Sequence, residues 1–399
     1  MTMSFINLAL KNIKGNLVRS MMAFICVLGI SAFFISTMVV SSGTRASMQK
    51  GLQRLGADLL VVPYGAQTDI ETALLMGKPS HIWMPQDYLD KISAMQGVAS
   101  VSPQIYLQSL YQASCCSVSE TFLVVYDPKT DFTVTPWLQQ NLGRELAPGE
   151  VVGGADIFSP GNNGTIELYG TTLNLVGNLE PTGTGMDQTI FFANDTAQEI
   201  AASSVTKAVS PLVIPQGKIS SILIKLKPGV DVRTVMAQVY LDLPDAVPVS
   251  TPQLFGTFRD QMLGLLGGVM VFIALAWVLS AILVGLVFSM SANERRRQMA
   301  VLRALGATRW YVLKSLIAEC SLVAAVAAMV GSVIGFLGIF IFQSYFSGTL
   351  KLPFLFPSAV SLLALYLLSL ALSLVTAAVA TVYPAIKISQ TEPAMGMRE

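Results

Sequence analysis

Four long apolar runs set the strongest constraint on how this chain folds. They lie at about residues 21–41, 262–290, 316–343 and 358–383. At 1.5 Å per helical residue, each run is long enough to cross the roughly 30 Å hydrocarbon core of a bilayer. Only 12% of the 399 residues are charged and 53% are hydrophobic, a balance outside the usage of ordinary soluble domains. The sequence therefore predicts a membrane protein with four transmembrane helices.

The first apolar run, "MMAFICVLGISAFFISTMVV", has two interpretations. Lys11, Lys14 and Arg19 precede it like the basic region of a secretory signal. Its apolar length is near twenty residues, however, and no A-x-A cleavage site follows it. We therefore expect a retained membrane anchor, preceded by an amphipathic segment that lies at the membrane interface or simply extends the helix into the cytoplasm.

The basic residues of the short loops and ends predict the orientation. The N-terminal segment has three basic residues and no acid, the 292–314 loop has six basic residues and one acid, and the tail contains Lys387 and Arg398. The 344–357 connection has only Lys351. The sequence thus predicts a multi-pass protein of the inner or plasma membrane, with both termini cytoplasmic and the segment after the first helix outside.

The external segment is large enough to fold on its own core. It contains 20 of the 24 acidic residues and 13 basic ones, and its short β-rich runs, bounded by Gly, Pro, Asp or Asn, alternate with helical patterns. We expect one large or two small mixed α/β subdomains, in which "PTGTGMDQ" at 181–188 is an exposed loop. The predicted organisation is as follows: 1–20 amphipathic cytoplasmic helix; 21–42, 261–291, 315–344 and 358–383 transmembrane helices; 43–260 extracytoplasmic α/β domain; 292–314 cytoplasmic helix; 345–357 short external loop; and 384–399 cytoplasmic tail.

The stretch "ANERRRQMAVLRALGATRWYVLK" at 292–314 predicts a short amphipathic helix between two membrane spans. Met299, Leu302 and Leu305 share one face, and arginines occupy much of the remainder. The basic residues alone are explained by contact with lipid headgroups. The apolar face allows a second use, which is docking into a groove on a cytoplasmic partner.

The same stretch resembles the signature of the MacB and FtsX family of ABC transporter permeases, in which "E-R-x-x-E-I-x-x-x-R-A-[IL]-G-A" precedes the third span. Further similarity lies in "YPAIKISQTEPAMGMR" at 383–398, in "NLALKNIKGNLVRS" before the first helix and in "LGADLLVV" just after it. The spacing of the spans and the large insert also agree. Two details differ, because the family often has an acid where Gln298 stands and ends in Leu-Arg where this chain has Met397 and Arg398.

The resemblance implies a fold of four transmembrane helices with a MacB-like periplasmic core domain between the first two. It implies two permease chains, identical or paralogous, that assemble on a cytoplasmic ABC ATPase and pass its motion to the external domain. The residues expected to contact the ATPase are Glu294, Arg295, Arg296, Met299, Leu302, Arg303, Leu305 and Gly306. An external partner is also conceivable, the lipid bilayer is the surrounding medium, and we expect no nucleic acid.

Within the spans, Glu319 is the only acid or base. A single carboxylate does not line a polar channel, so we expect it to pack or hydrogen-bond at a helix interface rather than transport ions. Gly331, Gly335 and Gly338 offer small faces for close helix approach.

The chain has no "G-x-x-x-x-G-K-[ST]" phosphate-binding loop. The "GK" at Gly77 and Lys78 lacks the preceding glycine and is followed by Pro79. We therefore expect ATP and Mg²⁺ on a separate ATPase, no catalytic residues in this chain and no cofactor of its own.

The adjacent Cys115 and Cys116 are the feature that the family explains least. In an external compartment they can form a vicinal disulfide, exchange with a redox partner or bind a transition metal, with His81 as a further candidate ligand; they can also be incidental. Cys26 and Cys320 lie in apolar spans and are expected to be packing residues.

The expected function is that of a permease subunit that couples ATP hydrolysis to substrate export or handling outside the membrane. Two alternatives stay open. One is an FtsX-like transmembrane regulator of an external partner, and the other is a component of a metal-linked or redox-linked transport pathway that uses Cys115 and Cys116. The sequence does not identify the substrate.

Overall fold

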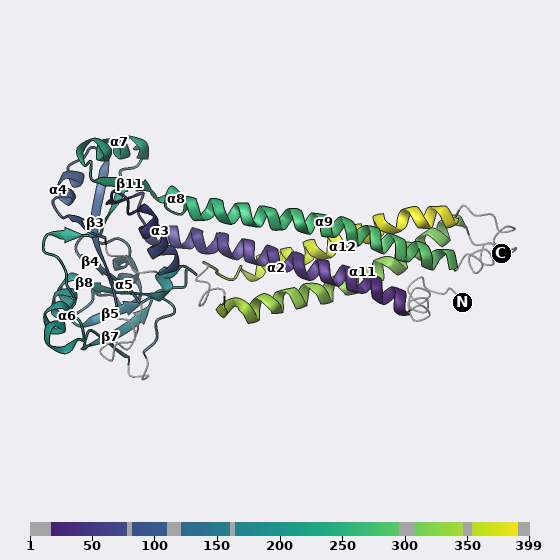
Figure 1. Cartoon of the computed structure of the whole chain (residues 1–399), viewed down its shortest axis with the longest axis horizontal. Helices are drawn as coiled ribbons and strands as arrows, with labels where there is room; N and C mark the ends of the chain where they lie inside the picture. The colour runs from purple at the N-terminus through teal and green to yellow at the C-terminus, as the bar shows by residue number, and fades with distance from the viewer. Residues whose placement is uncertain are drawn as a thin grey trace. The chain divides into compact units, whose positions relative to one another are not determined.

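The computed structural model of the chain describes residues 17–77, 82–109, 121–159, 164–294, 308–345 and 353–389. The chain divides into two compact units (Figure 1). The helical unit comprises Met1–Ser42, Met262–Gln343 and Phe356–Glu399, and the α/β domain comprises Gly43–Gln261 and Ser344–Leu355.

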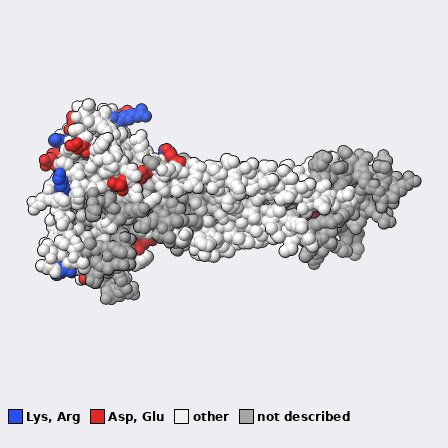
Figure 2. Space-filling model, viewed as in Figure 1, with Lys and Arg blue, Asp and Glu red and all other residues white. Residues whose placement is uncertain are grey.

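Four long helices make up most of the described part of the helical unit, and two of them, α2 and α9, continue into the residues of the α/β domain. They are α2 (Leu17–Leu55), α9 (Gly256–Glu294), α11 (Arg309–Ser344) and α12 (Ala359–Ser389). Within the described residues, these four are long and apolar enough to cross a membrane. In Figure 2, the charged side chains gather on the α/β domain, and the described surface of the helices is largely uncharged. The predicted fold class, four membrane helices with a mixed α/β domain, is confirmed.

Helix α2 is longer than the apolar run that predicts it. The helix has 39 residues, or about 58 Å, which is nearly twice the hydrocarbon thickness of a bilayer. Its last turns carry Arg45, Lys50 and Arg54, which end the apolar run at about residue 42 but do not end the helix. Met48 and Leu55 are buried in this extension, so the helix enters the α/β domain as one of its packed elements.

Small side chains bring the membrane helices together. Ala324, Ala327 and Ala328 of α11 are almost fully buried in a cluster that also contains Ala23 of α2 and Ala377 of α12. In a membrane, small interfacial residues let helix backbones approach closely and gain van der Waals contact. The core of the helical unit is therefore built mainly on α11.

The described strands of the α/β domain form one nine-stranded sheet in the order β11-β1-β10-β3-β4-β8-β5-β7-β6. Most neighbours are antiparallel, but β4–β8 and β5–β7 are parallel. The strands of this sheet are β1 (Leu59–Pro63), β3 (Val98–Gln108), β4 (Phe122–Tyr126), β5 (Glu150–Gly153), β6 (Thr165–Leu168), β7 (Thr171–Asn178), β8 (Thr189–Ala193), β10 (Ser221–Leu226) and β11 (Ala246–Ser250). The domain is thus one continuous sheet rather than two separate subdomains.

Six short α-helices, the 3₁₀ helix η1 (Gly185–Gln188) and a second small sheet complete the described part of the α/β domain. The helices are α3 (Gln67–Met76), α4 (Tyr88–Ser93), α5 (Thr135–Asn141), α6 (Asn194–Lys207), α7 (Val232–Asp242) and α8 (Thr251–Leu254), and the small sheet pairs β2 (Met84–Pro85) with β9 (Lys218–Ile219). Buried residues of α4 and α7 pack with β1, β10 and β11 in one core. Buried residues of α6 pack with β4 to β8 in a second core, so the two cores divide the length of the sheet between them.

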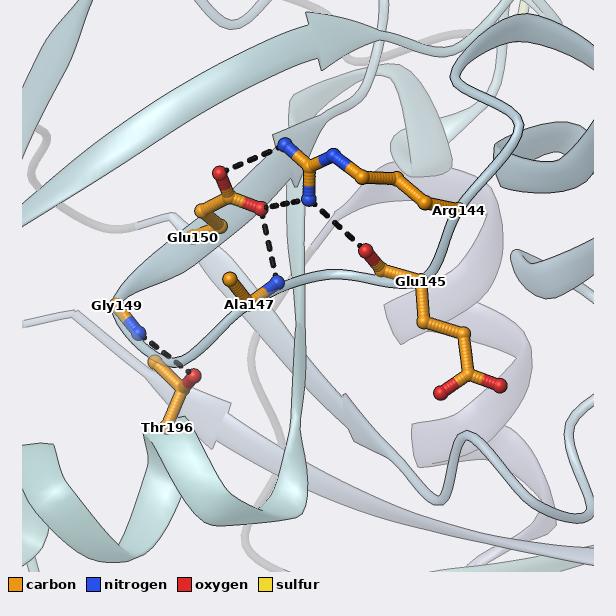
Figure 3. A network of polar contacts seen from close by, with 6 residues as sticks. All are labelled: Arg144, Glu145, Ala147, Gly149, Glu150 and Thr196. Carbon is orange, nitrogen blue, oxygen red and sulfur yellow. Dashed lines mark hydrogen bonds and ion pairs between the residues drawn. The ribbon is translucent and has the colours of Figure 1, made fainter.

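A polar network holds the turn that leads into β5 (Figure 3). Arg144 donates two hydrogen bonds to the Glu150 carboxylate, with N–O distances of 2.6 and 2.9 Å, and the N–H of Ala147 donates to the same carboxylate at 2.9 Å. These bonds hold the pKa of Glu150 below its usual value. The N–H of Gly149 donates to the Thr196 hydroxyl at 3.2 Å, which joins this turn to α6. The network therefore holds the start of β5 against α6, and both elements contribute residues to the second core.

Candidate functional site

Helix α11 packs directly against α2 at two glycines. A Cβ atom on Gly331 would lie closer than 3.0 Å to the carbonyl oxygen of Leu28, and one on Gly335 would lie equally close to that of Ala32. Real Cβ atoms do not reach such distances, so neither position has room for a side chain. The Ser36 hydroxyl of α2 also donates a 3.1 Å hydrogen bond to the carbonyl oxygen of Gly335. Gly338, the third glycine that the sequence predicts at a helix contact, makes no such approach to the described residues, because nothing lies within 4 Å of a Cβ added there.

Glu319 lies on the buried side of α11. Its side chain is 3% exposed, and the neighbouring Cys320 thiol donates to the carbonyl oxygen of Ala377 in α12, at 3.6 Å. A carboxylate in this position faces other helices rather than lipid. The geometry therefore places Glu319 at a helix interface.

A cavity of about 230 Å³ lies between α2, α9 and α12. Its walls are mostly apolar, with the hydroxyls of Ser31, Ser280 and Ser373 among the lining groups. None of the described residues that line it is ionisable. The cavity therefore offers no path of charged groups through the helical unit.

The segment at 181–188, which the sequence predicts to be an exposed loop, is buried, so this prediction was wrong. We call residues 182–187 the Asp187 loop. Thr182, Thr184, Met186 and Asp187 are each less than 9% exposed. A loop can be buried only if its backbone polar groups find partners inside the protein. The Asp187 side chain supplies them.

The Asp187 carboxylate gathers the start of its own loop. It accepts hydrogen bonds from the Thr182 N–H at 2.9 and 3.0 Å, from the Thr182 hydroxyl at 2.8 Å and from the Gly183 N–H at 2.5 Å. Burial raises the pKa of Asp187, while these bonds and the charge of Arg54 act in the opposite direction. The Asp187 carboxylate therefore stabilises the conformation of the loop through its hydrogen bonds to Thr182 and Gly183.

Glycines allow three other elements to close on the Asp187 loop. A Cβ on Gly51 of α2 would lie 2.8 Å from the Thr184 methyl group, and a Cβ on Gly185 would collide with the backbone of Gly77 at the end of α3. A Cβ on Gly154, just after β5, would meet the backbone of the loop itself. The Asp187 loop is thus a packing centre for α2, α3 and β5 within the α/β domain.

The Asp187 loop also receives the connection between α11 and α12. We call residues 353–355 the strap. The Phe354 N–H donates to the carbonyl oxygen of Gly183 at 2.9 Å, and the Leu355 N–H donates to that of Gly43 in α2 at 3.3 Å. A Cβ on Gly43 would overlap the Phe354 ring, and one on Gly183 would overlap the Phe354 carbonyl group. Two glycines therefore make the space in which the strap lies.

Most of the site residues predicted from the sequence lie outside the described residues. These are the seven coupling residues from Arg295 to Gly306, together with His81, Cys115 and Cys116. Of the predicted coupling residues, only Glu294 is described, as the last residue of α9. Among the described residues, no group of three or more His, Cys, Asp or Glu is placed to hold a metal ion.

Sequence reasoning missed the Asp187 loop and the strap. The only signal in the chain is the density of Thr and Gly at 182–185 followed by Asp187, which is also the composition of an ordinary surface turn. The strap sequence, "PFL", carries no sign of its partner more than a hundred residues earlier.

Comparisons with known proteins cover both parts of the chain. Residues 21–240, more than half of the chain, match the family model of the MacB-like periplasmic core domain. Residues 270–393 match the family model of the FtsX-like permease C-terminal region. No curated protein matches the chain at a significant level. Among solved structures, the periplasmic region of MacB from Actinobacillus actinomycetemcomitans is 12% identical and gives a TM-score of 0.34, over 53% of this chain and 98% of that one.

Proposed function

Because this chain belongs to the family of MacB-like and FtsX-like ABC transporter permeases, we propose that it couples ATP hydrolysis by a separate cytoplasmic ATPase to movements of its extracytoplasmic domain. These movements would drive the export or handling of a substrate outside the membrane. The observation that carries the proposal is the strap, which connects α11 to α12 yet belongs to the α/β domain and is hydrogen-bonded to two of its elements. A displacement of these helices would reach the domain through that connection.

The proposal assigns ATP hydrolysis to a partner chain. Binding of nucleotide phosphates by ABC ATPases requires a glycine-rich loop that ends in Gly-Lys-Ser or Gly-Lys-Thr, and the 399 residues contain no such motif. The contact with the partner would be made by the amphipathic segment at 294–306, whose apolar stripe of Met299, Leu302 and Leu305 suits a groove.

The orientation that we propose follows from charge. The N-terminal segment, the 292–314 loop and the tail carry the basic residues of the short connections, so these parts would be cytoplasmic and residues 43–260 would be outside. In this orientation the strap and the Asp187 loop lie on the outer side, and the ATPase contact lies on the inner side.

The chemistry of the helical unit supports transmission of movement rather than conduction through the helices. Glu319 is the only Asp, Glu, Lys, Arg or His in the four apolar runs, and the described residues that line the cavity between α2, α9 and α12 include none of these five residue types. Tight contacts at Gly331 and Gly335 instead join α11 to α2 as a packed pair. A packed pair can move as one body.

Copurification tests the proposal. The tagged chain is extracted from its own membranes in a mild detergent, and the bound proteins are identified by mass spectrometry. We expect an ABC ATPase together with a second permease chain, identical or paralogous, and ATP hydrolysis by the complex. Recovery of the chain without any ATPase, from membranes in which one is expressed, would contradict the proposal. Recovery of an ATPase together with an external hydrolase would favour an FtsX-like regulator of that hydrolase.

A further inference from the structure

We infer that Phe354 and the Asp187 loop form the joint through which the α11–α12 connection acts on the extracytoplasmic domain. This inference rests on the proposed function, because it names the residues that would transmit the movement. Phe354 is the inserted residue, Gly183 and Gly43 form the seat, and Asp187 is a positioning residue that shapes the seat without touching the strap through its own carboxylate.

The strap is held by two elements of the domain at once. Two consecutive backbone N–H groups, of Phe354 and Leu355, donate to two different elements, the Asp187 loop and α2. A strap fixed to only one element could slide or pivot on it. Because it is fixed to both, a displacement of the strap must move α2 and the loop together or break a hydrogen bond.

Phe354 fits closely between two glycines. A Cβ on Gly43 would overlap the phenyl ring, and a Cβ on Gly183 would overlap the Phe354 carbonyl. Gly183 also has a φ of 72°, a left-handed conformation that residues with a side chain rarely adopt. Protein interiors are close-packed and transmit strain, so a residue this closely surrounded cannot move without moving its neighbours.

Two prolines stiffen the chain on either side of Phe354. Pro353 and Pro357 stand on either side of Phe354 and are both buried. Each proline ring fixes its own φ and restricts the residue before it. The described residues 353–357 therefore have few accessible conformations, and a segment of this kind passes on a displacement that a flexible loop would absorb.

The Asp187 loop leads directly into the middle of the large sheet. Immediately after it, β8 runs from Thr189 to Ala193 and pairs with both β4 and β5 near the middle of the sheet. The loop also contacts α3 through Gly185 and Gly77. A displacement of the loop would therefore reach the sheet and a helix at once, rather than a peripheral turn.

Hydrogen exchange measured by mass spectrometry tests the joint in the complete complex with its ATPase. Exchange is compared without nucleotide and after trapping with ATP and vanadate. In the wild-type complex, we expect slow exchange at residues 353–356 and a nucleotide-dependent change in peptides that cover 182–193. Phe354→Ala removes the ring but keeps the N–H donor, so ATP hydrolysis should persist while the nucleotide-dependent change at 182–193 is lost.

A matched control separates the joint from a general loss of stability. Phe158→Ala makes the same chemical change at a residue of the same domain that is 73% exposed, and it should leave the nucleotide response intact. Phe354→Leu keeps an apolar side chain in the seat and should recover part of the response. If the Phe354→Ala complex shows the same nucleotide-dependent change in exchange as the wild type, the inference that Phe354 forms the joint is wrong.

Asp187 gives a second, independent test. Asp187→Asn replaces one carboxylate oxygen by a donor, which cannot accept from the Thr182 and Gly183 N–H groups. The seat should loosen, and exchange at 353–356 should become faster by about fivefold or more, because leaving a buried donor without its acceptor shifts an opening equilibrium by roughly that factor or more. Unchanged exchange there would show that Asp187 does not shape the seat. A wild-type complex that binds ATPase but shows no nucleotide response anywhere in the domain would instead overturn the proposed function.

Discussion

The backbone N–H of Phe354 donates a 2.9 Å hydrogen bond to the carbonyl oxygen of Gly183. The bond joins the connection between two membrane-crossing helices to a buried loop of the α/β domain. It is one of two such bonds, since Leu355 donates to Gly43 in α2. The α11–α12 connection is thus hydrogen-bonded both to the Asp187 loop and to α2.

Substitution at Gly335 should separate α11 from α2. Gly335→Ala adds a Cβ where the Ala32 carbonyl oxygen leaves no room, and forced overpacking typically costs about 1–3 kcal/mol. The matched control is Gly338→Ala on the same helix, where nothing lies within 4 Å of an added Cβ. Thermal unfolding in detergent, followed by tryptophan fluorescence, should show a lower midpoint for the first variant alone. Equal midpoints would mean that the two helices do not pack at Gly335.

Glu150 should make the stability of the domain depend on pH in the acid range. Its folded-state pKa is lowered by Arg144, so its contribution is present above the unfolded pKa of about 4.3 and is lost as the pH falls through the folded value. Glu150→Gln should therefore lower the unfolding midpoint slightly at pH 7, and the difference from wild type should shrink below about pH 4. Glu145→Gln is the control, because in Figure 3 the Glu145 carboxylate points away from Arg144. A constant difference across this range would exclude the ion pair as its cause.

The membrane helices and much of the sheet could be predicted from the sequence. A run of some twenty apolar residues has few alternatives to a membrane helix, and short β-rich runs bounded by turn residues predict the mixed α/β character of the external domain. The end of α2 at Leu55 could not be predicted in the same way. Its last turns pack on the α/β domain, so their helical structure depends on tertiary contacts rather than on an apolar run.

The Asp187 loop could not be predicted because its burial depends on distant residues. Thr, Gly and Asp favour turns in any sequence, and turns are usually exposed. Here Gly51, Gly77 and the strap remove the loop from solvent, and Asp187 satisfies its backbone. Those contacts join segments that lie far apart in the chain, and local pattern carries no information about them.

The apolar stripe of the cytoplasmic segment should be required for ATPase binding. Leu302→Asp and Leu305→Asp each place a charge on the face that we expect to dock, and the loss of a buried anchor residue costs about 2 kcal/mol or more. Affinity measured with the purified ATPase should fall by about 30-fold or more. Gln298→Glu is the control, since it introduces an acid where the related permeases often have one. Full ATPase binding by both leucine variants would assign the segment to lipid contact instead.

Cys115 and Cys116 should behave as a unit if they act chemically. Either single serine substitution would remove a disulfide or a two-sulfur ligand set, so Cys115→Ser, Cys116→Ser and the double variant should show similar losses. Intact-mass analysis distinguishes the two kinds of site, because a disulfide is reversed by reductant and a bound metal is lost on chelation. A double variant with unaltered transport and unaltered sensitivity to oxidants and metals would show that the pair is incidental. ATPase binding should persist in all three variants.

The central claim is that ATP hydrolysis inside moves the domain outside, and a distance measured between the two permease chains tests it most directly. A spin label carried by an unnatural amino acid at position 241, where Leu241 is 83% exposed on α7, is placed in each chain of the complex in lipid nanodiscs. Pulsed electron paramagnetic resonance then gives the label-to-label distance without nucleotide and after trapping with ATP and vanadate. We predict two different distance distributions for these states. The same distribution in both, with the ATPase demonstrably trapped, would contradict the account.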